Sequence, residues 1–281
     1  MSQLTATELV TLENAVRQLE TPRLASKLAD AVGIPLTTLM GRLPDSVQKH
    51  VNGAAESALQ KALNVALKTL NDEPADSPWN ATHKIAVTLT GVAGGMFGAP
   101  ALLAELPVTT TIMLRSIADI ARSKGENLSD PAVRLACLEV FALGANGEDA
   151  PDDLVERAAE ETEAEESLLR ASYFATRAAL AQQVTVAVRS LSKGGAVEGS
   201  SAIAKLISKL AARFGLAVSE KAAAQAVPIV GAIGGGLVNI VFMDHFQDTA
   251  EAHFSVRKLE RLYGDAVVRE EYERLAAAII K

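Results

Sequence analysis

The residues best suited to chemistry gather in one short stretch between Asp244 and His253. On a continuous helix, His245, Asp248 or Thr249, and His253 would follow one face, because residues three or four positions apart are neighbours. Imidazole and carboxylate groups in this pattern are typical of metal sites and of general acid–base catalysis. The stretch is therefore the first candidate for a metal-dependent or hydrolytic site.

The spacing of these residues argues against a simple metal site. His245 and His253 are two helical turns apart, about 12 Å on a straight helix, so they cannot share one ion unless the helix breaks. His245 and Asp248 offer two ligands, and further ligands would have to come from elsewhere. The carboxylates that come into question are Glu105, Asp119 and Glu139. We predict neither a metal nor a cofactor, and no catalytic residue, since the chain also lacks G-x-S-x-G, H-E-x-x-H and a P-loop.

A second group of charged residues stands in apolar surroundings. Arg115 and Asp119 are one helical turn apart, and Glu105 precedes them in a run of Leu, Ile and Met. Charges in such surroundings are tolerated when they pair, so we expect a partly buried ionic cluster. Two interpretations stay open, a cluster that specifies packing and a functional pocket.

Helices must position all of these residues, because apolar residues recur at three-to-four spacing and no comparable run alternates with period two. Asp130-Pro131 adds a helix-starting pair. The sequence predicts an all-α, multi-helix bundle. The ranges with helical periodicity are 5–20, 46–70, 131–144, 165–192, 199–214 and 250–280.

Two uncharged, glycine-containing segments stand out, residues 85–104 and residues 222–243. Both are long enough to span a bilayer. Their glycines and prolines lower helix propensity and hydrophobicity, so spanning would be marginal. We expect two central, glycine-rich apolar helices sheltered in the bundle. The alternatives are a hairpin that enters or lies on a bilayer, and permanent spans.

Composition narrows the function further. The 281 residues include 27 basic and 34 acidic ones, a formal charge of -7, which argues against nucleic acid as a partner. The one cysteine, Cys137, lies in an apolar run and is expected to be a buried free thiol. The N-terminus lacks the pattern of a secretory signal, so a cytoplasmic protein is expected.

The stretch NDEPADSP, residues 71–78, is the best candidate for a domain boundary. We expect an N-terminal helical appendage over residues 1–74 and a main helical domain over residues 75–281.

Two stretches resemble a known family. LPVTTTIMLRSIADIA, within residues 106–144, and HFSVRKLERLYG, within residues 226–264, are similar to the bacterial EcsC protein family. The resemblance covers roughly residues 75–281. It implies a helical bacterial protein, cytosolic or membrane-peripheral, in some cases encoded beside ABC-transporter components, with no agreed biochemical activity. The candidate residues that match these motifs are Arg115, Asp119, Asp244, His245, Gln247 and His253, and the resemblance assigns them no role.

Together, these features favour a non-catalytic helical accessory protein that binds a membrane surface or a partner such as an ABC-transporter component. It would be cytoplasmic, or peripheral at the inner face of the membrane. The alternatives are a metal-dependent hydrolase with a site around His245 and His253, and an intracellular module that binds an apolar ligand.

Overall fold

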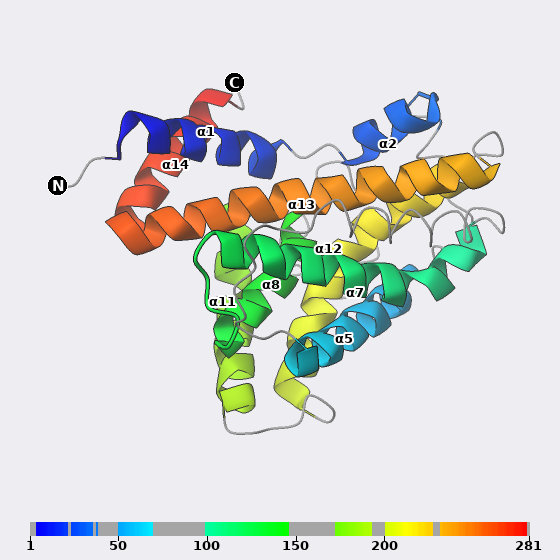
Figure 1. Ribbon diagram of the computed structural model, residues 1–281, viewed down its shortest axis with the longest axis horizontal. Coiled ribbons are helices and arrows are strands. Elements are labelled where there is room, and N and C mark those ends of the chain that lie inside the picture. Colours follow the sequence, from blue (N-terminus) through cyan, green and yellow to red (C-terminus); the bar gives the residue numbers. More distant parts are fainter. Residues whose placement is uncertain are drawn as a thin grey trace.

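The computed structural model describes residues 4–21, 24–35, 38, 50–69, 99–145, 172–192, 200–226 and 231–279. For residues 68, 69, 99–103 and 231–235 it describes the backbone only. Every regular element in these ranges is an α-helix, which confirms the predicted all-α bundle. Figure 1 shows their arrangement. The helices are α1 (Ala6–Glu20), α2 (Leu24–Val32), α5 (Val51–Thr69), α7 (Ala99–Ser123), α8 (Pro131–Leu143), α11 (Tyr173–Ser192), α12 (Ser201–Gln225), α13 (Gly231–Tyr263) and α14 (Asp265–Ile279).

Local sequence signals fix several helix ends. Thr5 and Glu8 form a reciprocal capping box at the start of α1. Asp130 accepts a hydrogen bond from the Ala132 amide, and Pro131 fills the first helical position of α8, as predicted. Gly264 has a φ of 86°, a left-handed conformation that glycine adopts readily, and it separates α13 from α14.

The long helix α13 organises the bundle and runs across its full width in Figure 1. One apolar core lies between α13 and α2, α5, α7, α8, α11 and α12, with Phe242 and Phe246 of α13 buried in it. A smaller core lies between the second half of α13, α1 and α14, and it contains Val256 and Tyr272. Since α13 contributes to both cores, the side chains along it meet different neighbours at each turn.

Several helices differ in extent from the prediction. The helix expected over 199–214 continues to Gln225, because its next residues are alanine-rich. The helix expected over 250–280 is divided at Gly264. The second uncharged segment, residues 222–243, is shared between the end of α12 and the start of α13. Most of the first, residues 85–98, lies outside the described residues.

The expected boundary at residues 71–78 also lies outside the described ranges. Helices α1, α2 and α5, which belong to the expected appendage, pack against α7, α12, α13 and α14. Cys137 is buried and free, as predicted. Within the described residues, no helix is both long and apolar enough to cross a bilayer.

Candidate functional site

The first group of polar contacts surrounds the C-terminus of α8. The last carbonyls of a helix lack intrahelical partners and need donors from elsewhere. Arg213 of α12 donates through Nε to the Ala142 carbonyl at 2.8 Å and through Nη2 to the Ala145 carbonyl at 2.6 Å. His245 of α13 lies with Nε2 at 2.5 Å from the Gly144 carbonyl. Arg213 and His245 therefore close the end of this helix.

Burial determines the ionisation of His245. Its side chain is 0 % exposed, and burial lowers the pKa to about 4, against the smaller opposing effect of the Gly144 carbonyl. The imidazole is therefore neutral at neutral pH, and its Nε2–H donates to Gly144. Burial also lowers the pKa of Arg213 to about 10, so the guanidinium stays charged beside the negative end of the helix dipole.

His253 belongs to a different network, formed by α11 and α13. The Tyr173 hydroxyl lies 3.0 Å from His253 Nδ1. Arg177 donates to that hydroxyl at 3.2 Å and to both carboxylate oxygens of Glu260, at 2.7 and 3.1 Å. Since the Arg177 guanidinium has only donors and no acceptor atom, the Tyr173 hydroxyl accepts from it and donates its own proton to His253 Nδ1.

The pKa shifts in this network favour a role in holding the fold together over a role in proton transfer. Burial lowers the pKa of His253 well below its ordinary value, and the charges of Arg177 and Arg257 lower it further. Burial raises the pKa of Tyr173 and of Glu139, and the positive charges of Arg177 and Arg257 offset only part of this rise. Tyr173 and His253 are 3 % and 0 % exposed, so these groups lie inside the protein.

A neighbouring acid joins the turn after α7 to the last part of α13. Glu126 accepts from Arg257 Nε at 2.8 Å and pairs with Arg261, while its own side chain is only 4 % exposed. Arg261 also donates to the Lys124 carbonyl at 2.8 Å. These pairs fix the loop between α7 and α8 on the long helix.

The third group, which we call the lysine centre, consists of Glu105 and Thr109 of α7, Lys221 of α12 and Asn239 of α13. Glu105 Oε1 accepts from Lys221 Nζ at 3.3 Å, from Asn239 Nδ2 at 2.8 Å and from Thr109 Oγ1 at 2.8 Å. The Lys221 side chain is 0 % exposed and its Nζ lies 5.0 Å from the centroid of the Phe242 ring. Three helices thus converge on one buried carboxylate.

Charge and burial compete at the lysine centre. Burial alone would raise the pKa of Glu105, but Lys221, Asn239 and Thr109 outweigh it and hold the pKa below its usual range. Burial lowers the pKa of Lys221, and the Glu105 carboxylate opposes that shift. A buried pair of this kind is stable only while both partners are present.

The predicted site residues are thus distributed over several neighbourhoods. Of the expected cluster, Glu105 turns to α12 and α13, Asp119 accepts from Arg122 at 3.1 Å, and Arg115 is exposed. Asp248 is exposed and pairs with Lys27 of α2 at 3.3 Å. Asp244 is half-buried, and the two histidines have separate partners. In the described part of the chain, no three His, Cys, Asp or Glu residues are grouped to hold a metal.

Several of the important partners were not predicted from the sequence. Lys221 had a usable signal, because it is the last charge before 22 uncharged residues. Arg257 and Glu260 stand three apart in the motif that follows His253, a spacing that puts them on one side of a helix. Tyr173 and Arg177 lie in a distant segment, and only the packing of α11 on the bundle identifies them.

Comparison with known proteins gives one result. The model of the EcsC protein family matches residues 7–259, so the chain belongs to this family. The match confirms the resemblance to this family. It begins in the N-terminal helices, before the expected start near residue 75, and ends at residue 259, before the expected end at residue 281. Neither the curated proteins nor the solved structures gave a match.

Proposed function

We propose that this member of the EcsC protein family is a non-catalytic helical accessory protein that binds a membrane surface. In this proposal the protein is cytoplasmic and acts peripherally at the inner face of the membrane. The contact is made by the end of the bundle where α7 and α13 begin, on the right in Figure 1.

The observation that carries the proposal is the ion pair of Lys221 with Glu105, at 3.3 Å. Glu105 directly follows the first uncharged segment, residues 85–104, and Lys221 directly precedes the second, residues 222–243. Because these two bracketing charges pair with each other, the first part of α7 and the last part of α12 lie together at this end of the bundle. The charges of Glu105 and Lys221 are turned inward, into the lysine centre.

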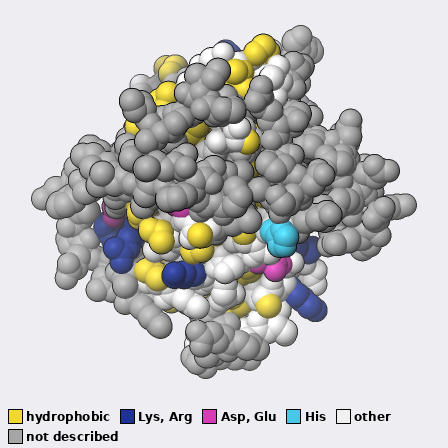
Figure 2. All heavy atoms as spheres, turned by 90° about the vertical axis from the view of Figure 1, so that its right-hand side faces the viewer, with side chains coloured by type: hydrophobic (Ala, Val, Ile, Leu, Met, Phe, Trp, Pro, Cys, Tyr) yellow, Lys and Arg dark blue, Asp and Glu magenta, His cyan; other side chains and the backbone are white. Residues whose placement is uncertain are grey.

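Exposed apolar side chains add to this support. Val108 of α7 is 46 % exposed and Leu237 of α13 is 41 % exposed, close in sequence to Glu105 and Asn239, which join the two helices. Figure 2 turns this end toward the viewer, and its described side chains include apolar groups beside basic and acidic ones. Apolar groups interspersed with basic ones are typical of surfaces that lie on a bilayer without crossing it.

The two histidines of α13 make their contacts inside the bundle, which favours a non-catalytic protein. His245 closes the end of α8, and His253 is held by Tyr173 inside the bundle. Both imidazoles are fully buried and neutral at neutral pH. A hydrolase would need such a group within reach of a substrate.

Vesicle flotation of the full-length protein tests the proposal. We expect it to float with phosphatidylcholine vesicles and with vesicles that also contain phosphatidylglycerol. Trp79, the one tryptophan, precedes the first uncharged segment by six residues, and we expect its fluorescence to shift to the blue on binding. A protein that stays at the bottom of the gradient with both vesicles would contradict the membrane contact.

Matched variants locate the contact. Leu237→Glu should weaken flotation, because it puts a charge on the contacting end. Leu262→Glu is the control, since Leu262 is 61 % exposed on the same helix but about 37 Å further along it. Equal loss in both variants would contradict the assigned end. Flotation that requires native membranes with their proteins would instead indicate a protein partner, such as a transporter component.

A further inference from the structure

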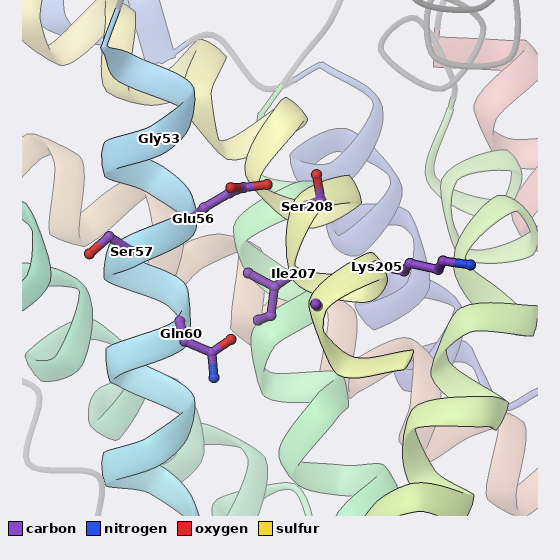
Figure 3. A pocket seen from close by; sticks show the side chains of 8 residues that line it. Gly53, Glu56, Ser57, Gln60, Lys205, Ile207 and Ser208 are labelled. Carbon is purple, nitrogen blue, oxygen red and sulfur yellow. The ribbon is translucent and has the colours of Figure 1, made fainter. Parts of the chain in front are cut away.

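A groove with a volume of about 600 Å³ opens between α5 and α12 (Figure 3). Small residues on both helices leave it open. Gly53 and Ser57 come from α5, and Ala204 and Ser208 come from α12, all of them exposed. The other lining residues are Glu56, Gln60, Lys205 and Ile207. Further along, the helices approach closely where Gly215 meets Asn52, so the groove has one closed end.

Three side chains point into the groove. Figure 3 shows Glu56 and Gln60 directed from α5 toward α12, and Ile207 directed from α12 toward α5, whereas Ser57 and Lys205 point away. Ile207 is 3 % exposed and forms an apolar floor. The groove therefore combines one acid, one amide and one aliphatic surface.

The two polar groups have unused binding capacity. Among the described residues Glu56 has no ion-pair partner, and the Gln60 Nε2 atom is buried and has no hydrogen-bond partner. Glu56 and Gln60 are four residues apart, so they are neighbours on one face of α5. A carboxylate accepts from a cation, and an amide nitrogen donates to a carbonyl.

We propose that this groove binds a segment of a partner protein in which a lysine or arginine stands beside an aliphatic residue. The basic side chain pairs with Glu56, and the aliphatic side chain covers Ile207. The Gln60 side chain turns out of its buried position and donates to a backbone carbonyl of the segment. The groove is open along its rims, whereas small-molecule sites enclose most of their ligand. A peptide laid between two helices needs no such enclosure. The formal charge of -7 adds a general attraction for a basic segment.

Methyl NMR of the full-length protein tests this inference directly. The probes are three peptides, acetyl-Ser-Ala-Ile-Xaa-Ala-Ser-amide, in which Xaa is lysine, norleucine or glutamate. We expect the lysine peptide to shift the Ile207 δ1-methyl signal in a saturable manner, with the signal assigned from Ile207→Val. The norleucine peptide should bind about three- to fivefold more weakly, the factor that a partly exposed ion pair gives. The glutamate peptide should bind most weakly.

Variants separate the groove from a general charge effect. Glu56→Gln keeps the shape and should abolish the preference for lysine over norleucine. Glu13→Gln removes an equal charge from α1, where Glu13 pairs with Arg17, and should leave the preference intact. Ala204→Trp, at an exposed position, should fill the groove and abolish the Ile207 shift.

Four outcomes would overturn the inference. They are an Ile207 signal that none of the peptides moves, equal affinity for the three peptides, a lysine preference that survives Glu56→Gln, and a shift produced by free n-butylamine but not by the lysine peptide. The last would indicate a small-amine site in place of a peptide groove. The test uses no vesicles and no residue of the proposed membrane end. Its failure would therefore not contradict the proposed membrane contact, and a failure of vesicle flotation would not contradict the peptide groove.

Discussion

The Nε2 atom of His245 lies 2.5 Å from the carbonyl oxygen of Gly144. This contact joins the end of α8 to the middle of α13, and it depends on the glycine. A Cβ atom at position 144 would lie 2.6 Å from Cε1 of the buried Phe246 ring. A residue with a side chain there would push apart the two helices that the hydrogen bond holds together.

Gly144→Ala should therefore destabilise the protein by about 1–3 kcal/mol, the usual cost of overpacking a core. Gly144 has a right-handed backbone conformation, so the loss reports steric crowding and not φ strain. Gly215→Ala is the matched control. Its new Cβ would meet the amide of the exposed Asn52, which can swing away, and alanine favours the helix. Urea unfolding followed by circular dichroism should show a loss only for Gly144→Ala, and equal losses would contradict this account.

His245 should also make stability depend on pH. The unfolded imidazole takes up a proton below its ordinary pKa of 6.5, whereas the folded one resists until about 4. The unfolded state thus binds more protons between these values, and the free energy of unfolding falls as the pH drops through this window. By about pH 5 the loss from this one group is about 2 kcal/mol.

His245→Gln tests this dependence, because glutamine can donate to Gly144 but does not titrate. Its unfolding free energy should fall less than that of the parent protein between about pH 7.5 and pH 5. The exposed His50 supplies the control, His50→Gln, which should retain the full acid sensitivity. An acid loss in His245→Gln as large as in the parent would exclude His245 as the source.

Periodicity and helix punctuation sufficed to predict the class of fold. Repeating apolar residues identified the helices, and Asp130-Pro131 marked the start of α8, because both signals are local. The second uncharged segment was harder. It carries no charge from residue 222 to residue 243, yet α12 ends at Gln225 and α13 begins at Gly231. Charge patterning carries no information on where a chain turns within an uncharged run.

The candidate site was predictable in its residue types but not in its partners. The spacing of His245 and His253 on one helix predicted that they cannot share one ion, and in the structure they have different partners. It did not show that Glu105 pairs with Lys221, 116 residues away, or that His253 meets Tyr173. Such contacts depend on how α7, α11 and α12 pack around α13, and one sequence does not determine that packing by local rules.

Tyr173→Phe should destabilise the protein by about 1–3 kcal/mol. It removes the hydroxyl between His253 and Arg177, so the buried His253 Nδ1 loses its hydrogen-bond donor and Arg177 Nη1 loses an acceptor. Tyr263→Phe provides the same chemical change at the surface, where the hydroxyl donates to Glu8 at 2.6 Å. Since solvent replaces that partner, the control should lose less. Thermal unfolding of both variants measures the difference, and a larger loss for Tyr263→Phe would contradict the importance of the buried network.

Cys137 should react slowly with a thiol reagent in the folded protein. Burial raises its pKa and closes access to it, and the nucleophile in such reactions is the thiolate. The chain has one cysteine, so Ellman's reagent reports on this site alone. We expect one equivalent to react rapidly in concentrated urea and almost none under native conditions. Rapid native labelling would show that α8 opens readily.

Of the substitutions considered, those in the lysine centre should lower the stability of the protein most. Lys221→Met leaves the Glu105 carboxylate, whose side chain is 7 % exposed, without its cation, and should destabilise the protein by about 3–5 kcal/mol. Arg269→Met breaks the exposed pair with Glu273 and should cost about 0.5 kcal/mol or less. Combining Lys221→Met with Glu105→Met removes both charges, so the double variant should unfold at a higher urea concentration than Lys221→Met alone. If the loss in the double variant equals the sum of the losses in Lys221→Met and Glu105→Met, the two charges are stabilised independently of each other. The ion pair would then not hold α7 and α12 together.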